Sequence, residues 1–366
     1  MNIRQLTKDD TGILKGIAIL GILMHNFLHW IEPLDCQENE FGFISSNIDS
    51  FFTAFHDKPT EFFNIIMSYF GHFGVQIFIF ISGFGLAMSM ANKACGYGRF
   101  LLDRLKKLYP LVIVAFVFYF FSTIIMSYRF VSAEEMKSFG YKFLLIHTLV
   151  PGEGESVCGP WWFFGLITQL YLLFPLAYWL IRKFGTKAFA IICLVSYAIV
   201  YTILYVPILP KDLFIMQNFP GHLPEFALGI LFACNNGKKV NILFFFAAIV
   251  IFCLGNFFKA FFPLTFLCLT YVMICGYMKI TEWSKGKILG KSFFAFFGSI
   301  SMVLFATHGE FRWQFAAIAK NHANAGFTIL MLLLFLIAAV IIALGANAIY
   351  KWMLNLVERR KAGIKE

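Results

Sequence analysis

Ten apolar stretches divide this sequence, and most of them are about 20 residues long. A helix rises about 1.5 Å per residue, so roughly 20 apolar residues cross the hydrocarbon core of a bilayer. We therefore expect an all-α integral membrane protein with about ten transmembrane helices. The stretches cover residues 12–31, 71–91, 109–128, 161–182, 187–206, 222–235, 241–258, 262–279, 294–317 and 326–349, and the sixth is the shortest.

The composition agrees with a membrane protein, because 60% of the residues are hydrophobic and only 14% are charged. Soluble domains carry about a quarter charged residues. The net charge of +10 would fit a nucleic-acid partner only if it formed a basic patch on a soluble face. Lys and Arg instead gather between alternate apolar stretches, as cytoplasmic loops do. We expect no nucleic-acid partner, both termini in the cytoplasm, and a multi-pass protein of the cytoplasmic (inner) membrane.

The N-terminal segment, MNIRQLTKDDT, does not look like a cleaved secretory signal. It is polar and long, and no small-residue cleavage site follows the first apolar stretch. We expect this stretch to remain as an anchor. We also expect residues 1–366 to form a single transmembrane domain with no attached soluble domain, so that any catalytic group lies among the helices.

The first stretch, GILKGIAILGILMHNFLHWI, contains His25, with His29 one helical turn further on. An ionisable group at membrane depth is costly and is a functional hypothesis by default. A neutral imidazole accepts a proton near neutral pH, so His25 is a candidate general base. The alternatives are a packing histidine for His25 and an interfacial residue for His29. The H-x-x-x-H spacing has no third ligand at a suitable distance along the chain, and we predict no metal site.

Other polar side chains lie inside or at the ends of later stretches. Ser82 could line a polar cavity or bond back to its own helix. Trp162 opens the fourth stretch, and His308 lies in the ninth together with Glu310 and Arg312. Helical spacing places His308 and Arg312 on one face. These side chains either contact the reacting groups or form a polar network that holds the bundle together.

Basic residues cluster at the expected cytoplasmic face. The segment GRFLLDRLKKLYP contains Arg99 and Arg104, and Lys15 reaches the same face from the first stretch. Guanidinium groups suit phosphates because of their forked donor geometry. The alternative is that these charges only set the topology.

Two long segments, 32–70 and 129–160, are expected on the outer side. Both are acidic and the first is rich in aromatic residues, a combination that suits sugar rings but also an ordinary interfacial belt. Each segment carries one cysteine, Cys36 and Cys158. A disulfide between them is a candidate if the outer side is oxidising, and two free thiols are the alternative.

Taken in order, six segments resemble the membrane-bound acyltransferase-3 family, which modifies cell-surface glycans in bacteria. They are GILKGIAILGILMH, QIFIFISGF, RFLLDRLKKLYP, PWWFFGLITQLYLLFPL, FALGILFA and FGSISMVLFATHGE. The resemblance implies a cytoplasmic acyl-CoA donor, used as co-substrate with no bound cofactor, and an extracytoplasmic hydroxyl acceptor. The family's catalytic histidine maps onto His25. Its basic residue before the first span maps onto Lys15, where many members have arginine, and its paired arginines map onto Arg99 and Arg104.

The expected function is therefore transfer of an acyl group, commonly acetyl, from acyl-CoA to a hydroxyl of a glycan or lipid-linked sugar. His25 would act as general base, or carry the acyl group itself. Ser82, Trp162 or His308 would shape the pore or stabilise the oxyanion. Two other functions remain open on the residues alone. A transporter or flippase of a glycan precursor would need no anion clamp at the cytoplasmic face, and a structural subunit of a polysaccharide synthase would not need His25.

Overall fold

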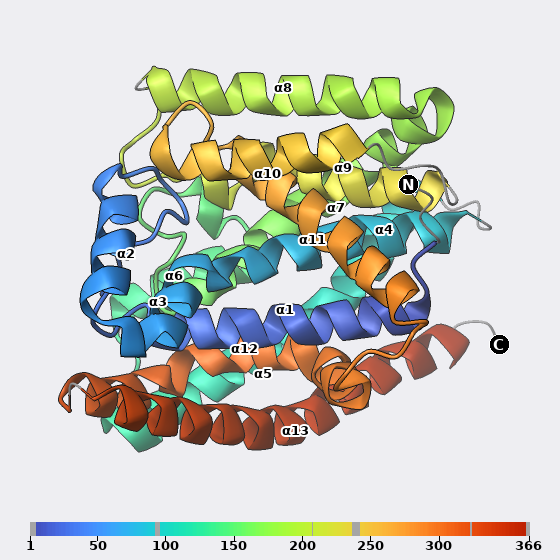
Figure 1. Cartoon of the computed structure of the whole chain (residues 1–366). Helices are drawn as coiled ribbons and strands as arrows, with labels where there is room; N and C mark the ends of the chain where they lie inside the picture. The colour runs from blue at the N-terminus through green and yellow to red at the C-terminus, as the bar shows by residue number, and fades with distance from the viewer. Residues whose placement is uncertain (1–4, 92–95, 207, 236–241, 323, 364–366) are drawn as a thin grey trace.

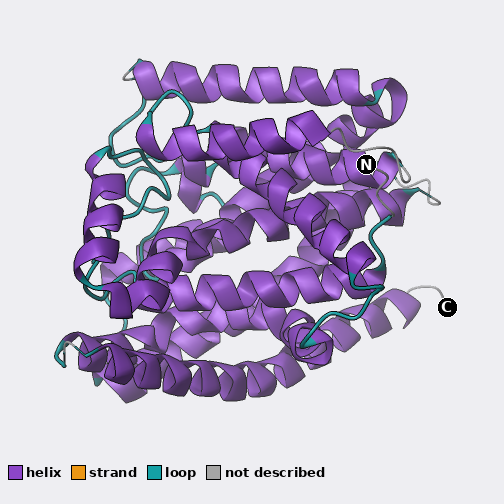
Figure 2. Ribbon diagram, viewed as in Figure 1, coloured by secondary structure: helices purple, strands orange, loops and turns teal. Residues whose placement is uncertain are grey.

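A computed structural model describes residues 5–91, 96–206, 208–235, 242–322 and 324–363. In this part of the chain all regular structure is helical and there is no strand (Figure 2). The α-helices are α1 (Lys8–Leu28), α2 (Ser46–Asp57), α3 (Phe62–Phe70), α4 (Gly74–Met90), α5 (Tyr97–Ser127), α6 (Ala133–Phe143), α7 (Trp162–Phe184), α8 (Thr186–Tyr205), α9 (Phe219–Cys234), α10 (Ile242–Phe257), α11 (Leu264–Trp283), α12 (Lys291–Lys320) and α13 (Ala325–Gly363). Five 3-10 turns join them at Pro59–Glu61, Gly71–Phe73, His147–Leu149, Gly159–Trp161 and Ile215–Gln217.

Eight helical segments of the described chain are long and apolar enough to cross a membrane. Each expected stretch has its helix, which confirms the all-α membrane architecture. Two of the ten, α9 and α10, have only 16 residues each and span about 24 Å, less than a typical hydrocarbon core. The second span is longer than expected, because α3, α4 and the two 3-10 turns that precede them form one continuous helical segment over Pro59–Met90.

The helices differ in how far they are buried inside the bundle. The spans of α1 and of Pro59–Met90 are 61% and 72% buried, whereas that of α8 is only 22% buried. Figure 1 accordingly shows α8 and α13 at opposite edges, with α1 and α4 between them. The outer helices therefore face lipid, and the two central segments carry the side chains that are most protected from it.

Helix α1 is held at both its start and its flank. Thr7 and Asp10 form a capping box, in which the Thr7 hydroxyl accepts from the Asp10 amide and the Asp10 carboxylate accepts from the Thr7 amide. Gly298 lets α12 approach closely, because a Cβ at this position would lie 2.0 Å from the Gly12 carbonyl oxygen. Such small-residue contacts are a common way for helices to pack in membranes. Helices α1 and α12 therefore form a tight central pair.

The same pair shows how the bundle is oriented. Near the start of both helices, Lys291 lies 3.2 Å from Asp9, and near their far ends Arg312 donates to Asn26. Helices α1 and α12 therefore run in the same direction. Helix α1 begins and α13 ends at the same end of the bundle (Figure 1). Both termini therefore lie on one side of the bundle, and that this side is the cytoplasm stays a prediction from the distribution of basic residues.

The two outer segments are not open loops. Helices α2 and α3 form from residues 46–70 and cover the end of the bundle at which α1 stops (Figure 1). Helix α6 forms within 129–160 and begins with a second capping box, between Ser132 and Glu135. Arg129 lies 2.8 Å from the Glu135 carboxylate and lowers its pKa. The outer end of the bundle is thus a folded cap, and the residues of the site lie beneath it.

Candidate functional site

A cavity of about 330 Å³ lies at the outer end of α1, beneath the cap. Its wall comes from five separate parts of the chain: the end of α1, the segment after it, the start of α4, residues 155–162 and the middle of α12. The lining combines imidazoles, carboxylates, indoles and one guanidinium group. The members used below are His25, His29, Glu40, Glu155, Trp162 and Arg312.

His25 has a defined orientation in this cavity. Its side chain is only 2% exposed, and its Nδ1 lies 2.9 Å from the carbonyl oxygen of Ser68. A carbonyl oxygen only accepts, so Nδ1 carries the hydrogen and Nε2 carries the lone pair. No described residue hydrogen-bonds to this Nε2, and the Glu40 carboxylate lies 3.7 Å from it. The tautomer required of a general base is therefore set by one backbone contact.

The chain explains why the Ser68 carbonyl is available. Ser68 lies in the last turn of α3, where carbonyl oxygens lose their intrahelical partners. Its hydroxyl donates to Asn64, and Asn64 in turn donates to the Glu32 carbonyl oxygen beyond α1. Gly71 follows, and a Cβ there would lie 2.7 Å from the Cβ of His25. The absence of a side chain at Gly71 therefore allows this turn to approach His25.

Two further histidines surround His25. The His29 ring stacks on it with ring centres 4.7 Å apart, and the His72 ring meets it edge-on at 5.4 Å. His29 Nδ1 lies 2.9 Å from Glu38. A carboxylate oxygen only accepts, so Nδ1 of His29 carries the hydrogen and donates it to Glu38.

Indole rings and one guanidinium group form the outer part of the cavity. The Arg312 guanidinium carbon lies 5.8 Å from the ring centre of Trp30 and 5.6 Å from that of Trp313, and its Nη1 donates to Asn26. Trp162 lies on the cavity wall. Glu155 also lines it, and burial raises the pKa of this carboxyl to about 7. Flat rings beside hydrogen-bonding groups are typical of sugar-binding surfaces.

Two sequence-predicted residues do not reach the cavity. Ser82 lies eight residues after the start of α4 and so about 12 Å along the helix from the cavity end, and it is not part of the lining. His308 is fully buried, but its Nδ1 lies 3.0 Å from the carbonyl oxygens of Leu304 and Phe305 in its own helix. Neither residue lines this cavity, and a role for them along the path of the donor stays a prediction. Arg312, one turn beyond His308, takes that place instead.

The three predicted donor-binding residues lie at the opposite end of the bundle from the cap. Lys15 is half-buried on α1, and Arg99 is exposed in the first turn of α5. Arg104 is half-buried with its guanidinium carbon 5.6 Å from the ring centre of Phe100, and its Nε has no partner among the described residues. No contact joins the three side chains in the described structure.

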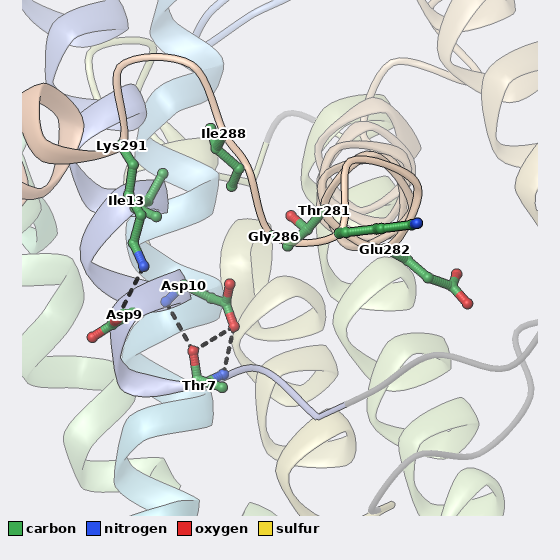
Figure 3. A pocket seen from close by; sticks show the side chains of 10 residues that line it. Thr7, Asp9, Asp10, Ile13, Thr281, Glu282, Gly286, Ile288 and Lys291 are labelled. Atoms are coloured by element: carbon green, nitrogen blue, oxygen red, sulfur yellow. Dashed lines mark hydrogen bonds and ion pairs between the residues drawn. The ribbon is translucent and has the colours of Figure 1, made fainter.

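A second cavity, of about 380 Å³, also lies at this end (Figure 3). None of the three predicted donor residues lines it. The carboxylates of Asp9, Asp10 and Glu282 do, and the Asp10 carboxylate accepts from the Tyr277 hydroxyl at 2.9 Å. Lys285 and Lys291 also line it, and Lys291 lies 3.2 Å from Asp9. Three carboxylates against two lysines leave a net negative lining, which suits the phosphates of a nucleotide-bearing donor poorly.

Cys36 and Cys158 both carry free thiols, which corrects the candidate disulfide. Cys36 is exposed, whereas Cys158 is buried with its Sγ 2.5 Å from where a Gly309 Cβ would lie. The Cys158 thiol thus packs on α12 beneath the cap, and its environment is apolar enough to raise its pKa well above the ordinary value. Cys36 points instead to the surface.

One group of side chains could hold a metal ion. Ligand atoms of His25, His29 and Glu38 all lie within 4.8 Å of one another. The sequence predicted no metal site, because no third ligand stood at a suitable spacing. Glu38 supplies that ligand from the segment that folds back over the end of α1. Sequence reasoning also missed His72, Glu40 and Glu155, whose approach to His25 depends on the tertiary structure.

Comparison with known proteins identifies the family. The acyltransferase domain described for the acyltransferase-3 family matches residues 12–348, nearly the whole chain. No curated protein and no solved structure matches. The match spans the cavity, His25 and every helix that lines the site. The chain is therefore a multi-pass membrane protein that belongs to the acyltransferase-3 family.

Proposed function

We propose that this protein is an O-acetyltransferase that moves an acetyl group from cytoplasmic acetyl-CoA to a hydroxyl of an extracytoplasmic glycan or lipid-linked sugar. The observation that carries the proposal is the free Nε2 of His25. It faces a cavity on the outer half of the bundle, and the Ser68 carbonyl holds the ring in the basic tautomer.

The reaction follows from this geometry. An acceptor hydroxyl in the cavity donates its hydrogen to Nε2 of His25 and attacks the thioester carbonyl as the proton leaves. The tetrahedral intermediate then expels the CoA thiolate, which takes the proton from Nε2 of His25 and leaves as the thiol, so that the free base is restored. Glu40, 3.7 Å from Nε2, stabilises the imidazolium ion that forms during the transfer.

The rim of the cavity supports a sugar acceptor. Trp30, Trp162 and Trp313 offer flat apolar faces for a pyranose ring, while Glu155 and Arg312 offer hydrogen-bonding groups for its hydroxyls. The cap formed by α2 and α3 excludes bulk water, which would otherwise compete with the hydroxyl for the acyl group.

The donor would enter from the cytoplasm. Lys15, Arg99 and Arg104 are proposed to hold the phosphates of CoA, while the slender pantetheine arm extends along α1. Lys15 and His25 are ten residues apart, about 15 Å along a helix. This separation is comparable with the length of a pantetheine arm. The membrane location implied is the cytoplasmic (inner) membrane, with the cavity on its outer side.

The central test replaces His25 by asparagine. The asparagine amide nitrogen occupies nearly the position of imidazole Nδ1 and keeps the bond to Ser68, but it provides no base. We expect purified His25→Asn protein to fold normally and to transfer acetyl groups about 10² to 10⁴ times more slowly than wild type. Transfer is measured with labelled acetyl-CoA and a surface glycan as acceptor.

A matched control is His147→Gln. His147 is also fully buried and bonds a backbone carbonyl, that of Trp161, through its Nε2, which a glutamine amide can replace. His147 does not line the cavity, and we expect it to be dispensable. Near wild-type turnover of His25→Asn would refute the catalytic role, and glycan translocation without acyl transfer would identify a flippase instead.

The donor site needs its own measurement. We expect Arg99→Ala and Arg104→Ala to weaken binding of acetyl-CoA to the detergent-solubilised protein, because each removes a positive charge that faces the phosphates. Lys183→Ala, at the cytoplasmic end of α7, is the control for loss of a surface charge. If all three variants bind acetyl-CoA as wild type does, the arginines serve only the membrane topology.

A further inference from the structure

Three buried atoms at the end of α1 have no hydrogen-bond partner among the described residues. They are Nε2 of His25, Nε2 of His29 and Oε2 of Glu38. The three side chains are 2%, 12% and 9% exposed, so bulk water does not satisfy these atoms. Buried polar atoms in native proteins nearly always have a partner, so the unpaired atoms of His25 and Glu38, next to the His29 ring, indicate a missing ligand.

The geometry indicates a metal ion as that ligand. One ligand atom from each of the three residues lies within 4.8 Å of the others, a spacing that a single ion can bridge. His25 and His29 are four residues apart and share one face of α1. Two imidazoles and one carboxylate form a ligand set that zinc and related divalent transition metals use, with a fourth position left open. Magnesium and calcium prefer oxygen ligands and fit less well.

The surroundings hold the ligands in place. The Cys36 amide donates to the His29 carbonyl oxygen and so turns the chain back after α1. Asn47 of α2 donates to the Glu38 carbonyl oxygen at 2.9 Å and keeps Glu38 next to the histidines. The Nδ1 atom of His25 is bonded as well, to the Ser68 carbonyl oxygen, while Nδ1 of His29 lies 2.9 Å from the Glu38 carboxylate, so these two side chains offer a nitrogen and an oxygen side by side. A metal-binding histidine usually donates its other ring N–H to a partner such as the Ser68 carbonyl.

We propose that His25, His29 and Glu38 bind a divalent ion of the zinc type, and that the bound ion inhibits the enzyme. The inhibitory part rests on the proposed function of His25. The lone pair on Nε2 of His25 cannot bind a metal and accept a proton at the same time. The ion therefore removes the base, and the fourth ligand position takes a water molecule from the cavity. The site faces the extracytoplasmic side, where free zinc would reach it.

The test measures zinc binding and activity separately. The full chain in detergent is treated with EDTA, dialysed and titrated with ZnCl₂ by calorimetry, in a Cys36→Ser background that removes the exposed thiol next to the site. We expect one ion per chain. Glu38→Gln and His29→Asn should each weaken binding at least 10-fold, because each removes one of the three proposed ligands. Glu155→Gln, which changes another carboxyl of the same cavity, is the control.

Acetyl transfer is then measured with and without ZnCl₂. We expect zinc to inhibit the wild type, EDTA to restore it, and Glu38→Gln to need at least 10-fold more zinc for the same fractional inhibition. Equal zinc binding by wild type and both ligand variants would overturn the site. Loss of activity on EDTA treatment, restored by zinc, would overturn the inhibitory role. Neither result affects the His25→Asn experiment, so failure of this proposal is distinguishable from failure of the proposed function.

Discussion

Glu40 offers a quantitative test of how the cavity supports proton transfer. Its carboxylate oxygen lies 3.7 Å from Nε2 of His25, the atom that becomes protonated in the proposed reaction. At an effective dielectric constant of about 20, two full charges at this distance attract by about 4.5 kcal/mol. The Glu40 side chain is 21% exposed, so solvent screens part of this attraction. The proton is also only partly transferred in the transition state.

These two reductions leave about 1 to 2 kcal/mol of transition-state stabilisation, which corresponds to about a 5- to 30-fold effect on rate. Glu40→Gln keeps the shape of the side chain and removes its charge. We expect kcat for acetyl transfer to fall by this factor, while KM for acetyl-CoA stays the same because the donor phosphates bind at the other end of the bundle.

The assay follows transfer of labelled acetyl groups at saturating donor and acceptor concentrations. Glu155→Gln is the matched control, since Glu155 lines the same cavity but has no ion pair with His25 in the described structure. An unchanged kcat in Glu40→Gln would refute the electrostatic role. An equal loss in both variants would show that the cavity responds to its total charge and not to the Glu40–His25 pair.

Two stability predictions follow from other parts of the structure. Burial lowers the pKa of Lys142 from its ordinary 10.5 to about 8, so the folded state binds its proton less readily than the unfolded state. The cost, roughly 3 kcal/mol, is fully present below pH 8 and disappears above about pH 10.5. Lys142→Met should therefore raise the thermal unfolding midpoint at pH 7 but not at pH 10.5, although it also gives up the bond to the Glu153 carbonyl oxygen. A rise of equal size at both pH values would contradict this. Gly298→Ala should destabilise the bundle by about 1 to 3 kcal/mol, because the new Cβ would lie 2.0 Å from the backbone oxygen of Gly12. Gly276→Ala on α11 has open space and should be neutral in the same melt, so equal midpoints for the two variants would count against the close α1–α12 contact.

The architecture could be predicted from the sequence because its signals are local. Hydrophobic length marks each helix, and a histidine within an apolar stretch is costly wherever that stretch packs. The prediction failed where the signal was short. Residues 46–57 have apolar side chains at Ile48, Phe51 and Phe55, the spacing of an amphipathic helix, and this pattern could have identified α2 within the outer segment.

The site was only partly predictable because most of its wall is non-local. Glu38 and Glu40 lie on a segment without periodic pattern, and Arg312 lies nearly 290 residues from Asn26, to which it donates. Their approach to His25 depends on how α12 and the cap pack against α1. The position of His308 was not predictable for the same reason. Which side of a helix faces a cavity depends on how that helix is rotated in the bundle.

The contacts of His25 also bear on whether the acyl group passes through the enzyme. Nδ1 donates to the Ser68 carbonyl, which cannot accept the hydrogen as a base would, so Nδ1 remains protonated throughout. An acyl group on Nε2 would then create a positively charged N-acylimidazolium ion. Such a species has an excellent leaving group and reacts readily with any water molecule that remains in the cavity.

Direct transfer avoids this intermediate, because His25 then carries only a proton. Both N–H groups of the imidazolium ion that forms have a partner: Nδ1–H donates to the Ser68 carbonyl oxygen, and Nε2–H faces the Glu40 carboxylate. The geometry therefore favours attack by the acceptor hydroxyl on the thioester itself. Rapid mixing of the enzyme with labelled acetyl-CoA in the absence of acceptor should give no labelled protein after acid quenching and no burst of free CoA. Stoichiometric release of CoA before acceptor is added would instead establish an acyl-enzyme.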